Sequence, residues 1–339
     1  MDFISLDSGY KPEVYKDGTE HLFFGGTSYL GLNYHPEYLS LFKDGLNIWG
    51  LNNGASRNNN IRLSIYQEAE ELLAKDYGCE AAVTLSSGWL AAQLAVEVLG
   101  KRRELIYIND AHPALYKENP GILNIDKAVD YINLSHQTNF LLISNSVNNI
   151  IPKIFYLSAL SQILPSKNIT LLLDHSHGFG FLEADYFTHL KKLPIHIDWL
   201  LCGSLAKGLS LDAGIIIGSN YQINEIKKTM TFNGSSPCSP SVLHTYLKSE
   251  SIRLTAKLRL FENLHFLTSQ LSREDFFWIE NFPVILVQNP SIVDKFKTNH
   301  FLFTSFPYPN PDSKILNRLV ISAAHQPKHL EKLLEIIEG

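Results

Sequence analysis

Cysteine is scarce in this 339-residue sequence, which contains only Cys79, Cys202 and Cys238. These residues lie far apart and in no metal-type spacing, so neither a disulfide framework nor a metal site is expected. The sequence also lacks any stretch of about 18 uninterrupted apolar residues, and its N-terminus lacks a basic region followed by an apolar core. We therefore expect no membrane span and no secretion signal, and the cytosol is the default location.

Positive charge is not in excess either. The 29 lysine and arginine residues are outnumbered by 34 aspartate and glutamate residues, which gives a net charge of -5. No long basic cluster is present, so nucleic acid is not expected as a partner. Hydrophobic residues make up 45% of the chain. A chain of this length and composition can bury a large core and is expected to divide into two domains.

Apolar runs of strand length alternate with helical patterns as far as about residue 220. Such alternation is typical of a doubly wound, mostly parallel sheet with helices on both faces. We therefore predict an α/β fold with an N-terminal segment over 1–45, a large domain over 46–220 and a smaller C-terminal α+β domain over 221–339. The expected strands are 81–85, 105–110, 139–145, 169–174, 199–204, 213–219, 282–288, 301–307 and 318–324, and the expected helices include 64–78, 89–100, 240–270 and 328–338.

The stretch LLLDHSHGFGFL, residues 171–182, ends an apolar run in an acid, two histidines and two glycines. Ligands of α/β sheets collect where parallel strands end, so Asp174 and His177 are candidate site residues. The plainer interpretation is an Asx-type turn that ends at Gly178, with His177 as an ordinary loop histidine.

A second candidate is the turn Ser86-Ser87-Gly88-Trp89, between an expected strand and an expected helix. Free backbone N–H groups and the helix dipole make such a turn a candidate phosphate-binding site. The plainer interpretation is an ordinary strand–helix turn in which serine caps the helix. A third is Lys207 in SLAKGLSLDAG, close to the same sheet edge. Desolvation lowers the pKa of an amine and makes it a nucleophile. The plainer interpretation is an exposed lysine in a surface loop, which would stay protonated.

A phosphate seat, a carboxylate for a pyridinium nitrogen and a Schiff-base lysine together describe a site for pyridoxal 5'-phosphate. In that interpretation Asp174 keeps the ring nitrogen protonated and His177 reaches the ring hydroxyl. His112, in IYINDAH, offers a flat group to stack on the ring.

Six motifs in the chain resemble those of the α-oxoamine synthase family of fold type I pyridoxal-phosphate enzymes. DHSHGFG is similar to the family's D-[DE]-A-H-G-x-G motif, and SLAKG resembles its lysine motif. The others are SYLGLNYHPE, GASR, LSSGWLAAQ and NRLVISAAH, which follow one another in the family order from about Thr27 to the end of the chain. The resemblance implies a large doubly wound domain and a smaller α+β domain.

The resemblance also implies roles for individual residues. Lys207 would carry the cofactor and move the α-proton of the substrate, and Asp174 would pair with the ring nitrogen. His177 would bond the ring oxygen, and His112 would stack on the ring.

Other residues would hold the phosphate and the substrate. The Gly88 and Trp89 amides and Ser204 would bind the phosphate, and Arg318 would clamp the substrate carboxylate, a bidentate task that suits a guanidinium. Family members are homodimers with shared sites, and FNGSSP lies where a hydroxyl usually reaches the phosphate of the neighbour. Asn233, Ser235 or Ser236 could serve there, with Ser235 our assignment.

The chain departs from the family pattern at several positions beside the cofactor. Asn145 stands where glutamate is usual, Asn149 where serine is usual, and His175 where a second acid is usual. Asn60-Ile61 replaces a usual Ser-Gly pair, and only about 26 residues precede SYLGL. We still assign Asn149 to the cofactor site. These departures affect the expected acyl-donor specificity more than the expected cofactor binding.

Three functions are compatible with these residues. The first is an α-oxoamine synthase that condenses an amino acid with an acyl thioester, carried by coenzyme A or a carrier protein, and releases CO2 to give an amino ketone. The second is an aminotransferase that uses Lys207, Asp174 and Arg318 with a 2-oxo acid; the histidine at position 112 disfavours it. The third is a catalytically quiet scaffold or partner subunit, which the retention of Lys207 disfavours.

Overall fold

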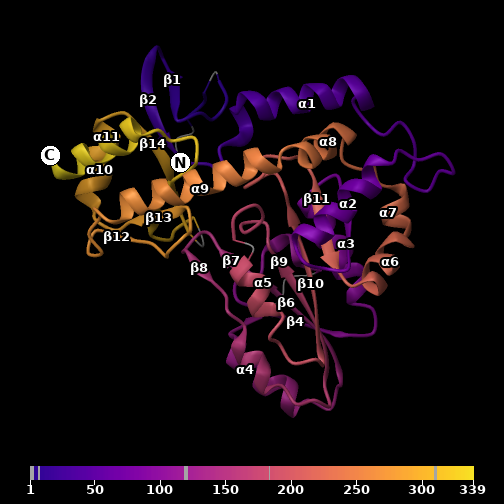
Figure 1. Ribbon diagram of the computed structural model, residues 1–339. Coiled ribbons are helices and arrows are strands. Elements are labelled where there is room, and N and C mark those ends of the chain that lie inside the picture. The colour runs from indigo at the N-terminus through magenta and orange to yellow at the C-terminus, as the bar shows by residue number, and fades with distance from the viewer. Residues whose placement is uncertain (1–3, 7, 118–120, 183, 309–310) are drawn as a thin grey trace.

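Two β-sheets organise the chain in this computed structural model, which describes residues 4–6, 8–117, 121–182, 184–308 and 311–339 (Figure 1). The larger sheet has seven strands in the order β3-β11-β10-β9-β6-β4-β5. Only β11 is antiparallel to its neighbours, β10 and β3, while the other pairs are parallel. Its strands are β3 (Ala81–Leu85), β4 (Glu104–Ile108), β5 (Ile122–Leu123), β6 (Asn139–Asn145), β9 (Asn168–Asp174), β10 (Ile197–Ser204) and β11 (Gly214–Gly218).

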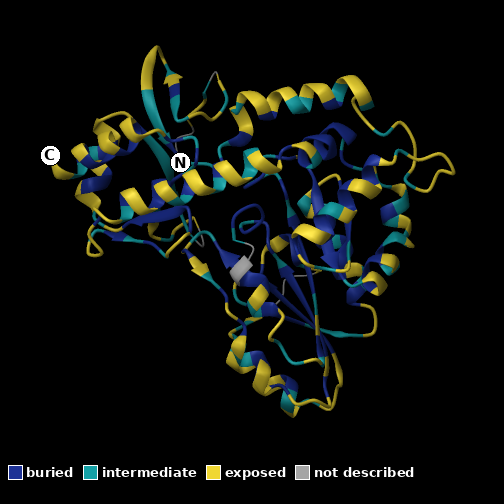
Figure 2. Cartoon of the chain, in the orientation of Figure 1, coloured by how far each residue is buried: buried dark blue, intermediate teal, exposed yellow. Residues whose placement is uncertain are grey.

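The central strands are apolar on both faces, as expected for a parallel sheet covered by helices. In β9 the run Ile169 to Leu173 is fully buried. Figure 2 shows buried residues in the sheet and exposed residues on the outer sides of the helices. The helices of this region are α2 (Ile65–Asp76), α3 (Gly88–Leu99), α4 (Ile125–Leu134), α5 (Ala184–Leu190), α6 (Asn220–Lys227) and α7 (Met230–Gly234), with short 3-10 turns η2 (Pro113–Leu115) and η3 (Ser158–Gln162) and a small ribbon of β7 (Val147–Asn148) and β8 (Lys153–Ile154).

The second sheet combines strands from both ends of the chain. Its order is β1-β2-β14-β15-β13-β12, and β2 runs parallel to β14. The N-terminal hairpin was not predicted, although Asp17-Gly18 signals it: both residues have positive φ, of 50° and 75°, as a tight hairpin turn requires. The strands are β1 (Glu13–Lys16), β2 (Thr19–Phe24), β12 (Phe276–Phe277), β13 (Val284–Val287), β14 (Phe301–Pro307) and β15 (Ile315–Val320).

The expected helix over 240–270 is two helices, and the prediction of one continuous helix was wrong. Ser249 ends α8 (Pro240–Lys248) and precedes α9 (Glu250–Thr268), with φ -107° and ψ 17°. Its hydroxyl donates to the carbonyl of Tyr246, and a serine that bonds nearby backbone competes with the helical pattern. The remaining helices are η1 (Leu32–Tyr34), α1 (Pro36–Trp49), α10 (Pro290–Thr298) and α11 (Pro327–Glu338).

The two sheets lie in separate parts of the molecule, and in this view α9 runs across the second, between the labels of β14 and β13 (Figure 1). The domain boundaries near residues 45 and 220 stay predictions. The pairing of β2 with β14 shows, however, that N-terminal strands belong to the sheet of the C-terminal region. Within the described ranges, no helix has both the length and the apolar character needed to cross a bilayer.

Candidate active site

The candidate site lies at the carboxyl edge of the large sheet, where three parallel strands end. Register pairs Asp174 at the end of β9 with Asn145 on β6 and with Cys202 on β10. The Asp174 carboxylate accepts the backbone N–H of Ser176 at 2.8 Å through Oδ1. The acid that ends the LLLD run therefore stands at the carboxyl edge of the sheet, where ligands of α/β sheets collect.

Lys207 follows β10 and brings a buried amine to the same edge. Its Nζ atom lies 2.9 Å from Nε2 of His177. Burial lowers the pKa of Lys207, and the Asp174 carboxylate partly opposes that shift. Burial, with the positive charges of Lys207 and Arg318, holds the pKa of His177 well below its usual range. The pair is thus a neutral imidazole beside an amine that deprotonates more readily than usual.

His112 follows β4 and is held by both its backbone and its ring. Its backbone N–H donates to Oδ1 of Asn145 at 2.9 Å, and its Nδ1 accepts the N–H of Ala114 at 3.1 Å. Burial lowers the pKa of His112, while Asp174 raises it and Lys207 lowers it further. These opposing influences place the His112 ring within the electrostatic reach of both site residues.

The start of α3 offers unpaired backbone donors beside the end of β10. The Ser87 hydroxyl caps the helix by accepting the N–H of Leu90 at 3.2 Å. The N–H groups of Gly88 and Trp89 have no acceptor among the described residues. A Cβ atom at position 88 would lie 2.6 Å from Cβ of Ser204, so only glycine lets this turn approach Ser204 so closely. A free helix start of this kind suits a phosphate.

Arg318 lies on β15 of the second sheet and is buried, with 4% of its surface exposed. Its Nε atom is buried without a hydrogen-bond partner within the described part of the chain. Burial lowers the pKa of Arg318, and Tyr29 raises it. A buried guanidinium without a carboxylate partner is costly unless a ligand supplies one.

A cavity of about 170 Å³ lies beside the residue that precedes Lys207 in the chain. Ala206 forms part of its wall, together with Thr27 and Ser28 before the YLGL motif and Ser322 and Ala324 after β15. The loop after β10 and the segments beside the second sheet therefore meet at this cavity.

The FNGSSP segment lies away from Lys207. The Ser235 hydroxyl donates to the Thr231 carbonyl of the helix that Ser235 follows, and the Oδ1 atom of Asn233 is buried without a partner among the described residues. Residues 233–237 and 52–56 together line a separate cavity of about 420 Å³. Within this single chain, FNGSSP does not join the Lys207 cluster, which leaves the predicted contact with a neighbouring subunit as a proposal.

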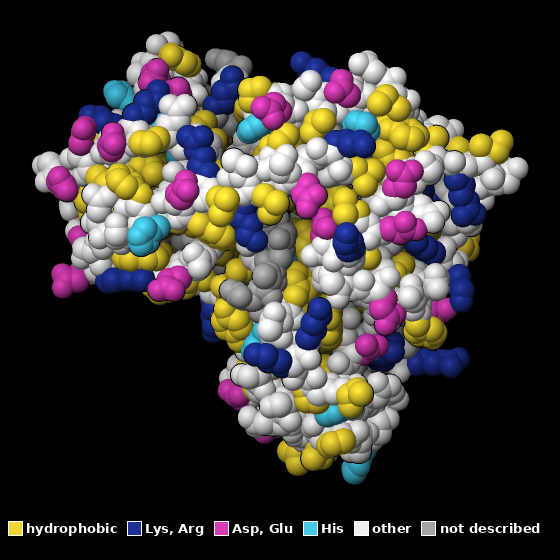
Figure 3. All heavy atoms as spheres, in the orientation of Figure 1, with side chains coloured by type: hydrophobic (Ala, Val, Ile, Leu, Met, Phe, Trp, Pro, Cys, Tyr) yellow, Lys and Arg dark blue, Asp and Glu magenta, His cyan; other side chains and the backbone are white. Residues whose placement is uncertain are grey.

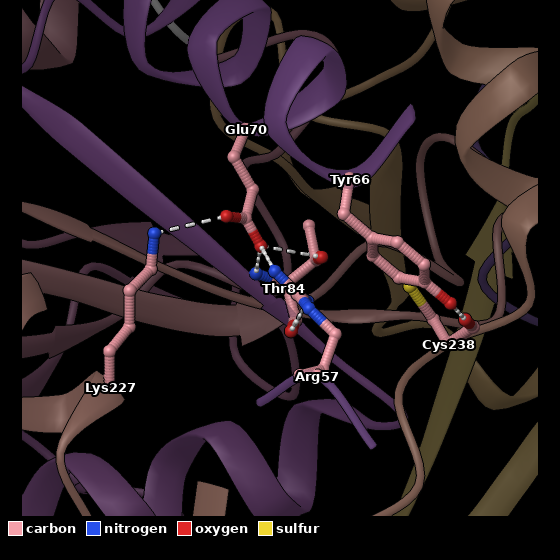
Figure 4. Close-up of polar contacts among 6 residues, drawn as sticks. All are labelled: Arg57, Tyr66, Glu70, Thr84, Lys227 and Cys238. Carbon is pink, nitrogen blue, oxygen red and sulfur yellow. Dashed lines mark hydrogen bonds and ion pairs between the residues drawn. The ribbon is translucent and has the colours of Figure 1, made fainter. Parts of the chain in front are cut away.

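Arg57 of the GASR loop is held by a buried acid instead of facing the cofactor residues (Figure 4). Its NH2 atom lies 2.8 Å from Oε1 of Glu70, which also accepts the backbone N–H and the hydroxyl of Thr84. Lys227 reaches the other oxygen at 3.1 Å. The adjoining cavity of about 770 Å³ reaches Ala81, at the end of β3 opposite to the Ser87 turn.

The departure at His175 has a structural explanation. Its Nδ1 lies 2.7 Å from Oγ of Ser146, and its ring stacks on Tyr186 with centroids 5.2 Å apart. A hydrophobic environment lowers the pKa of His175 to about 3. A second carboxylate would be poorly accommodated among Phe179, Tyr186 and Phe187.

Sequence reasoning missed Tyr29, although it lies within the quoted SYLGL motif. Its hydroxyl is 2.7 Å from Nδ1 of His177, across 148 positions of the chain. The polar side chain of Asn149 lowers the pKa of Tyr29, which places the predicted Asn149 near the His177 side of the cluster.

The chain belongs to the aminotransferase class I and II family, whose model matches residues 29–337. Among curated proteins it is similar to 8-amino-7-oxononanoate synthase from Pseudomonas paraeruginosa, with 25% identity over 98% of this chain and 88% of the relative. The Pseudomonas savastanoi protein of the same name is 26% identical over 75% of this chain and 67% of its own length.

Solved structures agree on the fold. Serine palmitoyltransferase of Sphingomonas wittichii has a TM-score of 0.80 and 19% identity, over 99% of this chain and 91% of that one. The 8-amino-7-oxononanoate synthase of Francisella tularensis has a TM-score of 0.69 and 16% identity, over 94% of this chain and 96% of that one. The predicted fold type I architecture and the family resemblance are confirmed.

Proposed function

We propose that this protein is an α-oxoamine synthase, a pyridoxal-phosphate-dependent acyltransferase that condenses an amino acid with an acyl thioester. The observation that carries the proposal is the contact between Lys207 and His177, within reach of Asp174 and facing Arg318 from the second sheet. The predicted transferase class and cofactor agree with the family match and with a structural relative solved with pyridoxal phosphate.

The residues present fit the cofactor. The free N–H groups of Gly88 and Trp89, beside Ser204, suit its phosphate, and the Asp174 carboxylate suits a protonated ring nitrogen. His112 would cover a face of the ring and His177 would donate to its oxygen. When bound, pyridoxal phosphate supplies a ring that accepts the electron pair left on the substrate α-carbon.

Lys207 has two tasks in this proposal. Its lowered pKa makes the Nζ atom available as a nucleophile that can attach to an aldehyde. The same atom, once released, can accept the α-proton of the amino acid and return a proton after the new carbon–carbon bond forms. The thiol leaves from the acyl carbon, and the carboxylate of the amino acid leaves as CO2.

Arg318 would bind that carboxylate until it departs. Its guanidinium, whose Nε atom has no partner among the described residues, can donate to a carboxylate in bidentate fashion. The names of the curated relatives favour alanine and a pimeloyl thioester, the pair joined in biotin synthesis, as substrates. The acyl donor in this proposal is a thioester of coenzyme A or of a carrier protein.

We also propose a homodimer in the cytosol. Large apolar side chains are exposed around α1 and the GASR loop, including Ile48, Leu51 and Ile61, with 63%, 78% and 77% of their surfaces accessible. Apolar groups gather near α1 in Figure 3, while basic and acidic groups are interspersed over that face. A second subunit covering this region would bring FNGSSP toward the phosphate seat of its neighbour.

The test is a substrate matrix of alanine, glycine and serine against acyl thioesters of several chain lengths. Release of free thiol together with CO2, dependent on both substrates, supports the synthase. In a parallel series with a 2-oxo acid added as amino-group acceptor, conversion of the amino acid to its own 2-oxo acid without thiol release would indicate the aminotransferase. No turnover in either series would indicate a silent scaffold. Lys207→Ala is the negative control, and borohydride reduction followed by peptide mapping should place the cofactor on Lys207 in the unmodified chain.

A further inference from the structure

A continuous chain of polar groups leads from Tyr29 to the lysine of the site. The Tyr29 hydroxyl lies 2.7 Å from Nδ1 of His177, and Nε2 of the same ring lies 2.9 Å from Nζ of Lys207. Tyr29 has none of its surface exposed. Each member therefore has its neighbour in this chain as a hydrogen-bond partner in place of water.

The protonation of each member follows from its surroundings. Burial raises the pKa of Tyr29, so its phenol keeps the proton. The polar side chain of Asn149 partly opposes that shift and lowers the pKa of Tyr29. His177 is neutral because burial and nearby positive charge lower its pKa. A neutral imidazole carries one N–H group and one acceptor nitrogen.

We propose that Tyr29 is a positioning residue that donates its hydroxyl proton to Nδ1 of His177, which keeps the ring proton on Nε2 and aims it at Nζ of Lys207. An Nε2–H group that faces Nζ can donate a hydrogen bond to the lone pair of a neutral amine. An ammonium ion has no lone pair, so its N–H groups would face the Nε2–H group without a bond. Tyr29 thus favours the nucleophilic form of Lys207 without touching Lys207 itself.

The surrounding charged groups make this arrangement necessary. Asp174 favours the charged form of Lys207, whereas burial favours the neutral form. His112, His175 and Arg318 also face His177 and disfavour its protonation. The Tyr29 bond decides which nitrogen of the neutral ring keeps the proton. Asn149, which lowers the pKa of Tyr29, stands where the resembling family usually has serine.

The test compares Tyr29→Phe with the unmodified full-length chain. Phenylalanine retains the ring packing against Phe181 and Phe282, at 5.4 and 6.5 Å between centroids, and removes only the hydroxyl. The tautomer of His177 is read from nitrogen-15 shifts in histidine-labelled protein, with His177→Gln to assign the signal. We expect the proton on Nε2 in the unmodified chain and a mixture of tautomers in the variant.

The second measurement is the pH dependence of Lys207 labelling in cofactor-free protein by formaldehyde and cyanoborohydride, followed by peptide mapping. Only the neutral amine reacts, so the midpoint reports its pKa. We expect the midpoint to rise by about one pH unit in Tyr29→Phe. Asn149→Ala should shift it in the same direction by less, and supplies the test if Tyr29→Phe does not fold.

Tyr66→Phe is the matched control. Its hydroxyl is also buried, and it donates to the Cys238 carbonyl at 2.7 Å instead of to His177 (Figure 4). Neither readout should change in that variant. A ring proton on Nδ1 in the unmodified chain, or an unchanged Lys207 midpoint in folded Tyr29→Phe, would overturn the inference.

The inference rests on the proposed function for the use made of Lys207, but neither measurement requires turnover. If both readouts behave as expected and no thioester reacts, the proposed function fails and the role of Tyr29 stands. If thiol is released and the His177 tautomer is the same in Tyr29→Phe as in the unmodified chain, the proposed function stands and the positioning role of Tyr29 fails.

Discussion

The Asn145 side chain connects β6 to the loop that carries His112. Its Nδ2 donates to the Asp110 carbonyl at 2.7 Å, while its Oδ1 accepts the His112 N–H at 2.9 Å. Only an amide can do both, because a carboxylate has no donor for the carbonyl. The residue that departs from the family pattern therefore fixes the group expected to stack on the cofactor.

Replacing Asn145 should weaken cofactor binding. Asn145→Ala removes both bonds and frees the His112 loop, so we expect the dissociation constant for pyridoxal phosphate to rise about tenfold, equivalent to about 1.4 kcal/mol. Absorbance titration of cofactor-free protein measures this. Asn168→Ala, which removes an exposed bond to Asn139 at the other end of the sheet, should leave the constant unchanged. Equal binding by Asn145→Ala would show that the loop needs no such support.

Asp174→Asn should separate ring chemistry from structure. The amide oxygen can still accept the Ser176 N–H, so the turn should survive, but a neutral group cannot stabilise a protonated pyridine nitrogen. We expect exchange of the amino-acid α-proton to slow by a factor of about 10² or more. Proton NMR in heavy water follows the exchange without any acyl donor. His177→Ala should cost less, and an Asn variant as fast as the unmodified chain would rule out this role for Asp174.

Stability should fall on acidification below pH about 6.5. Burial lowers the pKa of His175 to about 3 and that of His325 to about 4, whereas both titrate normally after unfolding. The unfolded chain then binds more protons, so the stabilisation present above pH 6.5 is lost as the pH falls toward the folded values. Each histidine contributes about 1.4 kcal/mol per pH unit in that window.

Urea unfolding at several pH values measures this dependence. His175→Phe keeps an aromatic ring against Tyr186 and should flatten the dependence by one proton. His136→Phe, at an exposed position, is the control and should leave the slope as it is. An identical slope in His175→Phe would mean that His175 does not titrate differently on folding.

Glu70 should be the critical member of the cluster that anchors the GASR loop. Glu70→Ala leaves the Arg57 guanidinium, which is 11% exposed, without its carboxylate, and we expect a loss of about 3 kcal/mol in unfolding free energy. Glu70→Gln retains an acceptor for Thr84 and should lose less. Lys227→Met removes the more exposed partner and should change stability by under about 1 kcal/mol. Chemical denaturation compares the three, and equal losses would contradict this ranking.

Local patterns predicted the elements around the site well. β3, β6 and β14 match the expected ranges, because short apolar runs bounded by turn residues specify strands. The Asp174 and Lys207 motifs also predicted their neighbourhood, since parallel strands bring their carboxyl ends to one edge. The break at Ser249 escaped because serine is compatible with a helix until its hydroxyl finds a backbone partner.

The contribution of Tyr29 could not be predicted from local patterns. Its partner His177 is 148 positions away, and nothing in SYLGL indicates which side chain its hydroxyl meets. The orientation of Ser235 toward Thr231 likewise depends on α7, the helix that Ser235 follows, which the sequence pattern did not reveal.

The parallel pairing of β2 with β14 determines how late during synthesis the second sheet can be completed. Synthesis proceeds from the N-terminus, so the β1–β2 hairpin emerges from the ribosome long before Phe301 to Phe303, its partners on β14. Such a sequence-distant contact is costly to close and forms late. Tyr29, five residues beyond the end of β2, then acquires its final surroundings only when nearly the whole polypeptide has been translated. The nascent chain should remain unable to retain its cofactor until that closing event.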